Sequence, residues 1–209
     1  LTASISWNFQ GPMMGLISGI GVAAAMISAI ATFGLWIFSW IIKPTPHRAP
    51  YTAPIYAAGM GFAIGLISQQ FESLFPGIVI QAVSLTFFVA ASLLLLYKTG
   101  VIRPDQNFLL IMACATLGIF FTYIANIFYA MATGSSFSII TDTGLMGIGF
   151  SLFVVVIAAL NLVLDFDIIE QAAETRAPKY MEWFGAMALV MTLIWLYLEI
   201  LRLLAKLRS

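Results

Sequence analysis

The chain has 209 residues, of which 62 % are hydrophobic and 9 % charged, with a formal net charge of +0 and a mean hydropathy of +1.03. Soluble domains are about 45–50 % apolar and about 25 % charged, so this composition excludes a soluble enzyme, a nucleic-acid-binding protein and a disordered chain. The balanced charge implies no electrostatic partner. The composition instead predicts an all-α integral membrane protein whose surroundings are the lipid bilayer.

Six apolar segments are long enough to cross a bilayer as helices, because about 20 apolar residues span its hydrocarbon core. They are predicted over residues 14–42, 52–74, 77–97, 108–131, 144–166 and 181–205. Pro76 and Gly77 predict a tight turn, and Asp105 is a candidate N-cap for the helix that follows it. No repeat or linker interrupts the pattern, so a single transmembrane helical domain over residues 1–209 is predicted.

The basic residues are distributed unevenly among the loops. Six of the nine lie in the loops after the first, third and fifth segments, which are therefore predicted to be cytoplasmic: Lys43, Arg48, Lys98, Arg103, Arg176 and Lys179. The remaining three, Arg202, Lys206 and Arg208, end the chain on the opposite side if every segment crosses. This basic tail conflicts with the charge rule. Either the earlier loops outweigh it or the last segment crosses incompletely, and the length of residues 181–205 favours a full crossing.

The sequence contains no catalytic or metal-binding motif. It has one histidine, His47, and one cysteine, Cys114, and neither a nucleophile elbow nor a glycine-rich phosphate loop. We therefore expect no enzymatic activity, no cofactor and no firm metal site. Function has to reside in the few polar groups within the spans.

Asp165 is the most informative of these groups. It follows the apolar run 154–164, and if the helix continues through Glu174 it lies about 14 Å from the helix end. Intramembrane acids are rare and usually face a cavity. With Asn161 one turn earlier, Asp165 is a candidate titrating gate or cation site; the alternative is an aspartate at the water interface. We favour the gate for Asp165 and the interface for Asp167.

A second group of polar residues is predicted near the non-cytoplasmic ends of the helices. It comprises Glu72, Asn126, Glu199 and Arg202. Arg202 follows Glu199 by three residues, so a local ion pair is available on the helix surface. An ion-channel mouth and a structural hydrogen-bond network explain such an outer polar cluster equally well.

Several stretches of the chain resemble the bacterial branch of the Bax inhibitor-1-like family, the transmembrane Bax inhibitor motif proteins. They are residues 51–57, 75–82, 96–103, 158–170, 177–183 and 195–204. The resemblance implies a seven-helix bundle with the last helix at its centre and one more helix before the first one present here. That agrees with a chain that begins at Leu1, so we expect an N-terminal tail and first helix to be missing from it.

The same resemblance implies a function. Family members are associated with pH-sensitive calcium leak, and some bacterial members modulate a membrane-bound protease. Their gate is a pair of aspartates; Asp165 matches the first position, and Thr192 stands at the second, with Glu199 about 10 Å further along that helix. We therefore expect a pH-modulated calcium or cation leak of the bacterial inner membrane gated by Asp165, with calcium as the transported ion. The alternative is a non-conducting interaction protein or regulatory subunit of a larger membrane complex.

Overall fold

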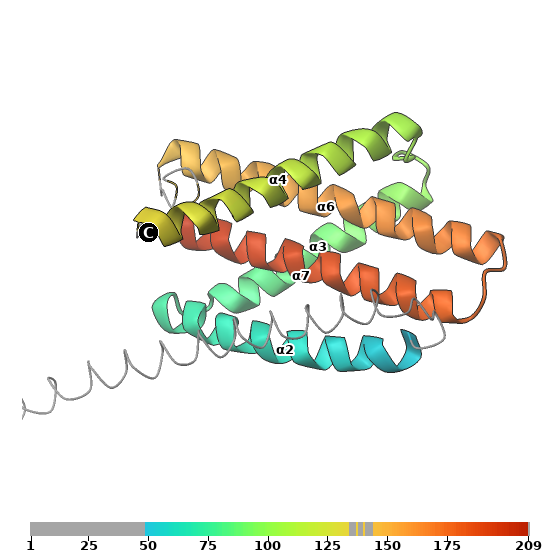
Figure 1. Cartoon of the computed structure of the whole chain (residues 1–209), viewed down its shortest axis with the longest axis horizontal. Coiled ribbons are helices and arrows are strands. Elements are labelled where there is room, and N and C mark those ends of the chain that lie inside the picture. Colours follow the sequence, from blue (N-terminus) through green and yellow to red (C-terminus); the bar gives the residue numbers. More distant parts are fainter. Residues whose placement is uncertain (1–48, 134–136, 138–139, 141–143, 209) are drawn as a thin grey trace, which may run out of the picture. The chain divides into compact units, whose positions relative to one another are not determined.

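The computed structural model describes residues 49–133, 137, 140 and 144–208 (Figure 1). They belong to two compact units, Leu1–Pro76 and Gly77–Ser209. The described part of the first unit is one long helix, α2 (Ala49–Leu74), which accommodates Pro54 near its start. The predicted first span over residues 14–42, together with His47, lies outside the described residues. The prediction of a single transmembrane domain stays a prediction.

The second unit contains four long helices: α3 (Ile78–Lys98), α4 (Gln106–Thr133), α6 (Leu145–Glu174) and α7 (Tyr180–Arg208). All four are long and apolar enough to cross a membrane. Every helix predicted from the apolar runs in residues 49–208 is present, and no strand occurs in the described ranges. The all-α prediction is therefore confirmed, whereas the predicted count of six spanning helices is not, because four spans are identified in the part of the chain described.

The ends of these helices follow from local residue chemistry. Gly77 precedes α3 with φ 81°, a left-handed backbone conformation that glycine adopts without strain. Asp105 accepts a hydrogen bond at Oδ1 from the Phe108 backbone N–H over 2.7 Å, which confirms it as the N-cap of α4. After α6 the chain turns at Arg176, with φ 49°. Because α6 continues to Glu174, it extends well beyond the end of its apolar run.

The core of the second unit lies around α6, which packs against α3, α4 and α7, while α7 also packs against α3. Met112 and Ile119 of α4 meet Val154 and Ile157 of α6 in a buried cluster, with Trp195 of α7 packed against it. Helices α6 and α7 run antiparallel along their length (Figure 1). The central place of the last helix in a larger bundle stays a prediction.

Candidate functional site: a buried aspartate and two polar clusters

Asp165 lies in α6 nine residues before the helix ends at Glu174. The helix is therefore continuous through Asp165, as assumed from the sequence. Asp165 is 9 % exposed, and its carboxyl group lies beside the Thr192 side chain of α7. The Thr192 hydroxyl also lies 3.2 Å from the Ala188 carbonyl one turn earlier in its own helix. Atom Oδ2 of Asp165 is buried without a hydrogen-bond partner among the described residues. The structure thus brings Asp165 and Thr192 together and leaves one carboxyl oxygen available.

Asn161 is directed toward a different helix from Asp165. Its amide nitrogen donates to Thr116 Oγ1 of α4 over 3.0 Å and to the Ile157 carbonyl over 2.8 Å. Asn161 therefore joins α6 to α4, whereas the Asp165 side chain faces α7. The two residues are one helical turn apart, but they contact different helices.

Asp167 belongs to a polar cluster where α3 and α6 end. Tyr97 Oη of α3 lies 3.3 Å from Asp167 Oδ1 and also contacts Glu170, and Gln171 Nε2 donates to Asp167 Oδ2 over 2.6 Å. Asp167 is thus engaged on the α3 side of α6 and is not joined to Thr192 by any described contact. The interpretation of Asp167 as a residue near the water interface stays a prediction.

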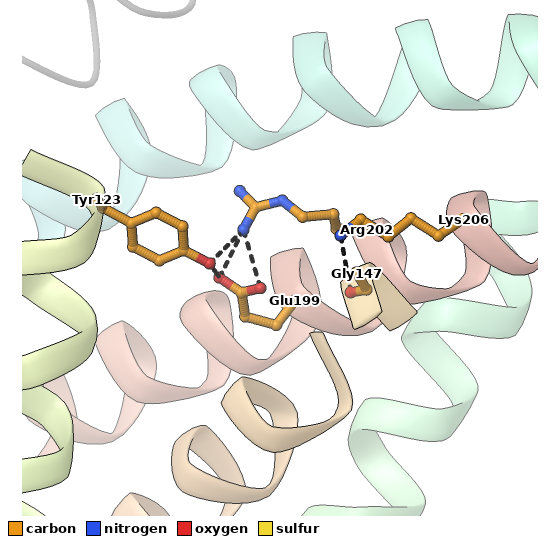
Figure 2. A network of polar contacts seen from close by, with 5 residues as sticks. All are labelled: Tyr123, Gly147, Glu199, Arg202 and Lys206. Carbon is orange, nitrogen blue, oxygen red and sulfur yellow. Dashed lines mark hydrogen bonds and ion pairs between the residues drawn. The ribbon is translucent and has the colours of Figure 1, made fainter. Parts of the chain in front are cut away.

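Glu199 and Arg202 form the predicted ion pair on α7, with Arg202 Nη1 3.0 Å from each carboxylate oxygen (Figure 2). Tyr123 of α4 completes this outer clasp, the name used below for Tyr123, Glu199 and Arg202. Its hydroxyl donates to Glu199 Oε1 over 3.0 Å and accepts from Arg202 Nη1 over 2.5 Å. The Arg202 guanidinium also lies 5.2 Å from the centre of the Tyr123 ring. The Glu199 side chain is 3 % exposed and that of Arg202 38 %.

Asn126, a further member of the predicted outer polar cluster, has a different partner. Asn126 Oδ1 accepts a hydrogen bond from the Phe137 backbone N–H over 2.7 Å. Glu72 lies in the last turn of α2 and belongs to the first unit. The structure therefore brings together Glu199 and Arg202, adds Tyr123, and does not join Asn126 to them.

The basic C-terminal tail is bound to the helix ends of the second unit. Lys206 is 8 % exposed, and its Nζ donates to the Gly147 carbonyl at the start of α6 over 3.0 Å (Figure 2). Arg208 Nη2 donates to Gln81 Oε1 at the start of α3 over 2.8 Å. Because Arg202 is also paired, each of the three tail cations has a partner within the protein.

Sequence reasoning missed three of these contacts: Tyr123 with the ion pair, Tyr97 with two acids, and Lys206 with Gly147. The position of Tyr97 at a predicted helix end is typical of an interfacial aromatic residue. Such a position indicates the depth of the side chain in the membrane but not the residues that it contacts. Within residues 49–133, 137, 140 and 144–208, no three histidine, cysteine or acidic side chains gather in a potential metal site.

The described helices and their buried polar groups define the class: this is a multi-pass α-helical membrane protein. In a comparison with known protein families, the model of the family described as Bax inhibitor 1 like matches residues 1–209. The chain belongs to the Bax inhibitor-1-like family. No curated protein and no solved structure matches it.

Proposed function

We propose that the protein is a pH-modulated cation leak of the bacterial inner membrane, which carries calcium and is gated by Asp165. The observation that carries this proposal is the buried Oδ2 atom of Asp165, which has no hydrogen-bond partner among the described residues. A carboxylate buried in this way is costly unless it binds a proton or a cation. Membership of the Bax inhibitor-1-like family supports the same function.

The chemistry of the Asp165 site suits weak and reversible cation binding. Carboxylate oxygens are preferred calcium ligands, and the Thr192 hydroxyl supplies a neutral oxygen beside them. A proton on Asp165 would occupy the same oxygen, so protons and cations compete. One carboxylate binds a divalent ion less tightly than several do, and conduction requires an ion to leave as readily as it enters.

The proposal is tested by calcium flux into liposomes that contain the purified protein, measured between about pH 5 and pH 8. Asp165→Asn keeps the size of the side chain and removes its titration. We expect flux that depends on pH in the unmodified protein and flux without pH dependence in the variant.

The matched control is Glu174→Gln, an equivalent change at an exposed acid that ends the same helix. It is expected to keep the pH dependence of the unmodified protein. Unchanged pH dependence in Asp165→Asn would disprove the gate. If the unmodified protein gave no more flux than empty liposomes, the leak itself would be disproved and the non-conducting interaction protein would become the better proposal.

A further inference from the structure

Helix α4 is the least firmly attached helix of the second unit. Among the described helices of that unit, α4 packs its backbone only against α6, whereas α3 and α7 each pack against two others. Most large apolar side chains of α4 are exposed, among them Leu110, Phe121 and Phe128. A helix whose backbone packs against one neighbour can move with less rearrangement than a helix packed between two.

Two polar contacts hold α4 in addition to its apolar cluster with α6, against which Trp195 of α7 also packs. Thr116 accepts the Asn161 amide of α6 over 3.0 Å, and seven residues further on Tyr123 enters the outer clasp with α7. Among the described residues, the outer clasp joins α4 directly to α7 through polar contacts. Thr116 and Tyr123 lie on the same face of α4, since seven residues make about two helical turns.

Tyr123 is the contribution of α4 to the clasp, and its hydroxyl occupies the centre of that contact (Figure 2). The hydroxyl donates to the buried Glu199 carboxylate and accepts from the Arg202 guanidinium. Hydrogen bonds to charged groups are stronger than those between neutral groups, above all where water is scarce. Glu199 and Arg202 remain paired through α7 alone, so α4 can separate from α7 without breaking the ion pair.

The other contact of α4 lies beside the candidate gate. Asn161, which bonds Thr116, is one helical turn from Asp165 along α6, about 6 Å. Movement of α4 away from α6 would therefore open the molecule one turn from the buried carboxyl group. The clasp at Tyr123 is remote from Asp165 and controls access to it only through the position of α4.

We infer that α4 is the moving gate helix and that Tyr123 is the positioning residue that holds it closed through Glu199 and Arg202. The significance of this movement for ion flux rests on the proposed function. The movement itself is a property of the fold and can be measured without any ion.

The experiment measures the distance between α3 and α4 by pulsed electron spin resonance in lipid nanodiscs. Spin labels are attached at Ile80→Cys and Ile127→Cys, which are 72 % and 57 % exposed, in a Cys114→Ser background that leaves no other cysteine. Ile80 lies near the start of α3 and Ile127 near the end of α4. The labelled protein with Tyr123 unchanged should give one narrow distribution of the α3–α4 distance.

Tyr123→Phe keeps the ring and removes only the hydroxyl. We expect a second, displaced distance population, with the ratio of displaced to closed molecules raised about tenfold, which corresponds to about 1.4 kcal/mol. Glu199→Gln, which removes the charge that the hydroxyl contacts, should shift the distribution in the same direction. Tyr129→Phe is the matched control on α4, because the Tyr129 ring stacks on Phe137 and lies outside the clasp. Its distribution should equal that of the unmodified protein.

Identical distributions for Tyr123→Phe, Glu199→Gln and the unmodified protein would overturn the inference, as would an equal displacement in Tyr129→Phe. A displaced population in a protein that conducts no calcium would support the moving helix and contradict the proposed function. Calcium flux that depends on Asp165, together with an α4 that does not move, would support the proposed function and contradict the moving helix. If both hold, Tyr123→Phe should also raise calcium flux about tenfold, in proportion to the displaced population.

Discussion

Asp165 of α6 and Thr192 of α7 face each other across the most extensive helix contact of the second unit, and only one of the two is an acid. A second carboxyl group at the position of Thr192 would be coupled to the first, because two close acids do not both ionise cheaply. With a hydroxyl there instead, Asp165 has no such partner at this position of α7. Any pH dependence of the protein at this site should therefore follow a single proton.

Replacement of Asp165 by asparagine should stabilise the folded protein. The wild-type carboxylate is buried with an oxygen that lacks a described partner, and a buried charge without a partner costs more than a neutral polar group. The asparagine side chain would keep the volume and carry no charge, so we expect a gain of about 1 kcal/mol in the free energy of unfolding at neutral pH. Thermal unfolding in detergent measures it. A clear loss of stability would instead indicate that the carboxylate stabilises the fold.

The outer clasp predicts an unequal effect of removing its two charges. Arg202→Gln leaves the Glu199 carboxylate buried and unpaired, which should cost about 3 kcal/mol. Glu199→Gln leaves Arg202, whose longer and more exposed side chain can reach the interface, and should cost about 1 kcal/mol. Unfolding of both variants and of the double variant in detergent measures these differences. The double variant should be more stable than Arg202→Gln alone, and equal costs for the two single changes would contradict this account.

The helices and some local contacts can be predicted from the sequence because they depend on neighbouring residues. The apolar runs give the spans, Asp105 gives a cap within three residues, and Glu199 and Arg202 meet because they are three residues apart on one helix. The extension of α6 beyond its apolar run can only be assumed from the sequence. Its last residues are polar, and hydropathy does not separate a protruding helix from a loop.

Contacts between helices cannot be predicted in the same way. The Tyr123 and Lys206 contacts depend on how far one helix is displaced along another, which no pattern within a single segment specifies. Thr192 can be placed opposite Asp165 only through the family resemblance. The sequence predicts Asn126 and Glu199 at one depth. Two residues at equal depth can still point in different directions around their helices, and Asn126 bonds the Phe137 backbone.

The cap at the start of α4 gives a local stability prediction. Asp105→Ala removes the acceptor for the Phe108 N–H, which should cost about 1 kcal/mol of unfolding free energy. Asp105→Asn keeps an acceptor oxygen and should lose much less. The comparison is made by denaturant titration in mixed micelles. If alanine and asparagine had the same effect, the charge of Asp105 and not its hydrogen bond would be the stabilising feature.

Gly185 on α7 tests the close approach of α6 and α7. A Cβ atom at this buried glycine would lie 2.9 Å from Ile169 Cγ1 on α6, closer than carbon atoms pack. Gly185→Ala should therefore destabilise the protein by about 1–3 kcal/mol, because α7 or the Ile169 side chain must shift. Gly118 on α4 is the matched control, since a Cβ atom there meets nothing within 4 Å. Alanine is the better helix former, so Gly118→Ala should stabilise α4 by up to about 1 kcal/mol, and unfolding measurements that gave both variants the same sign would contradict the packing described.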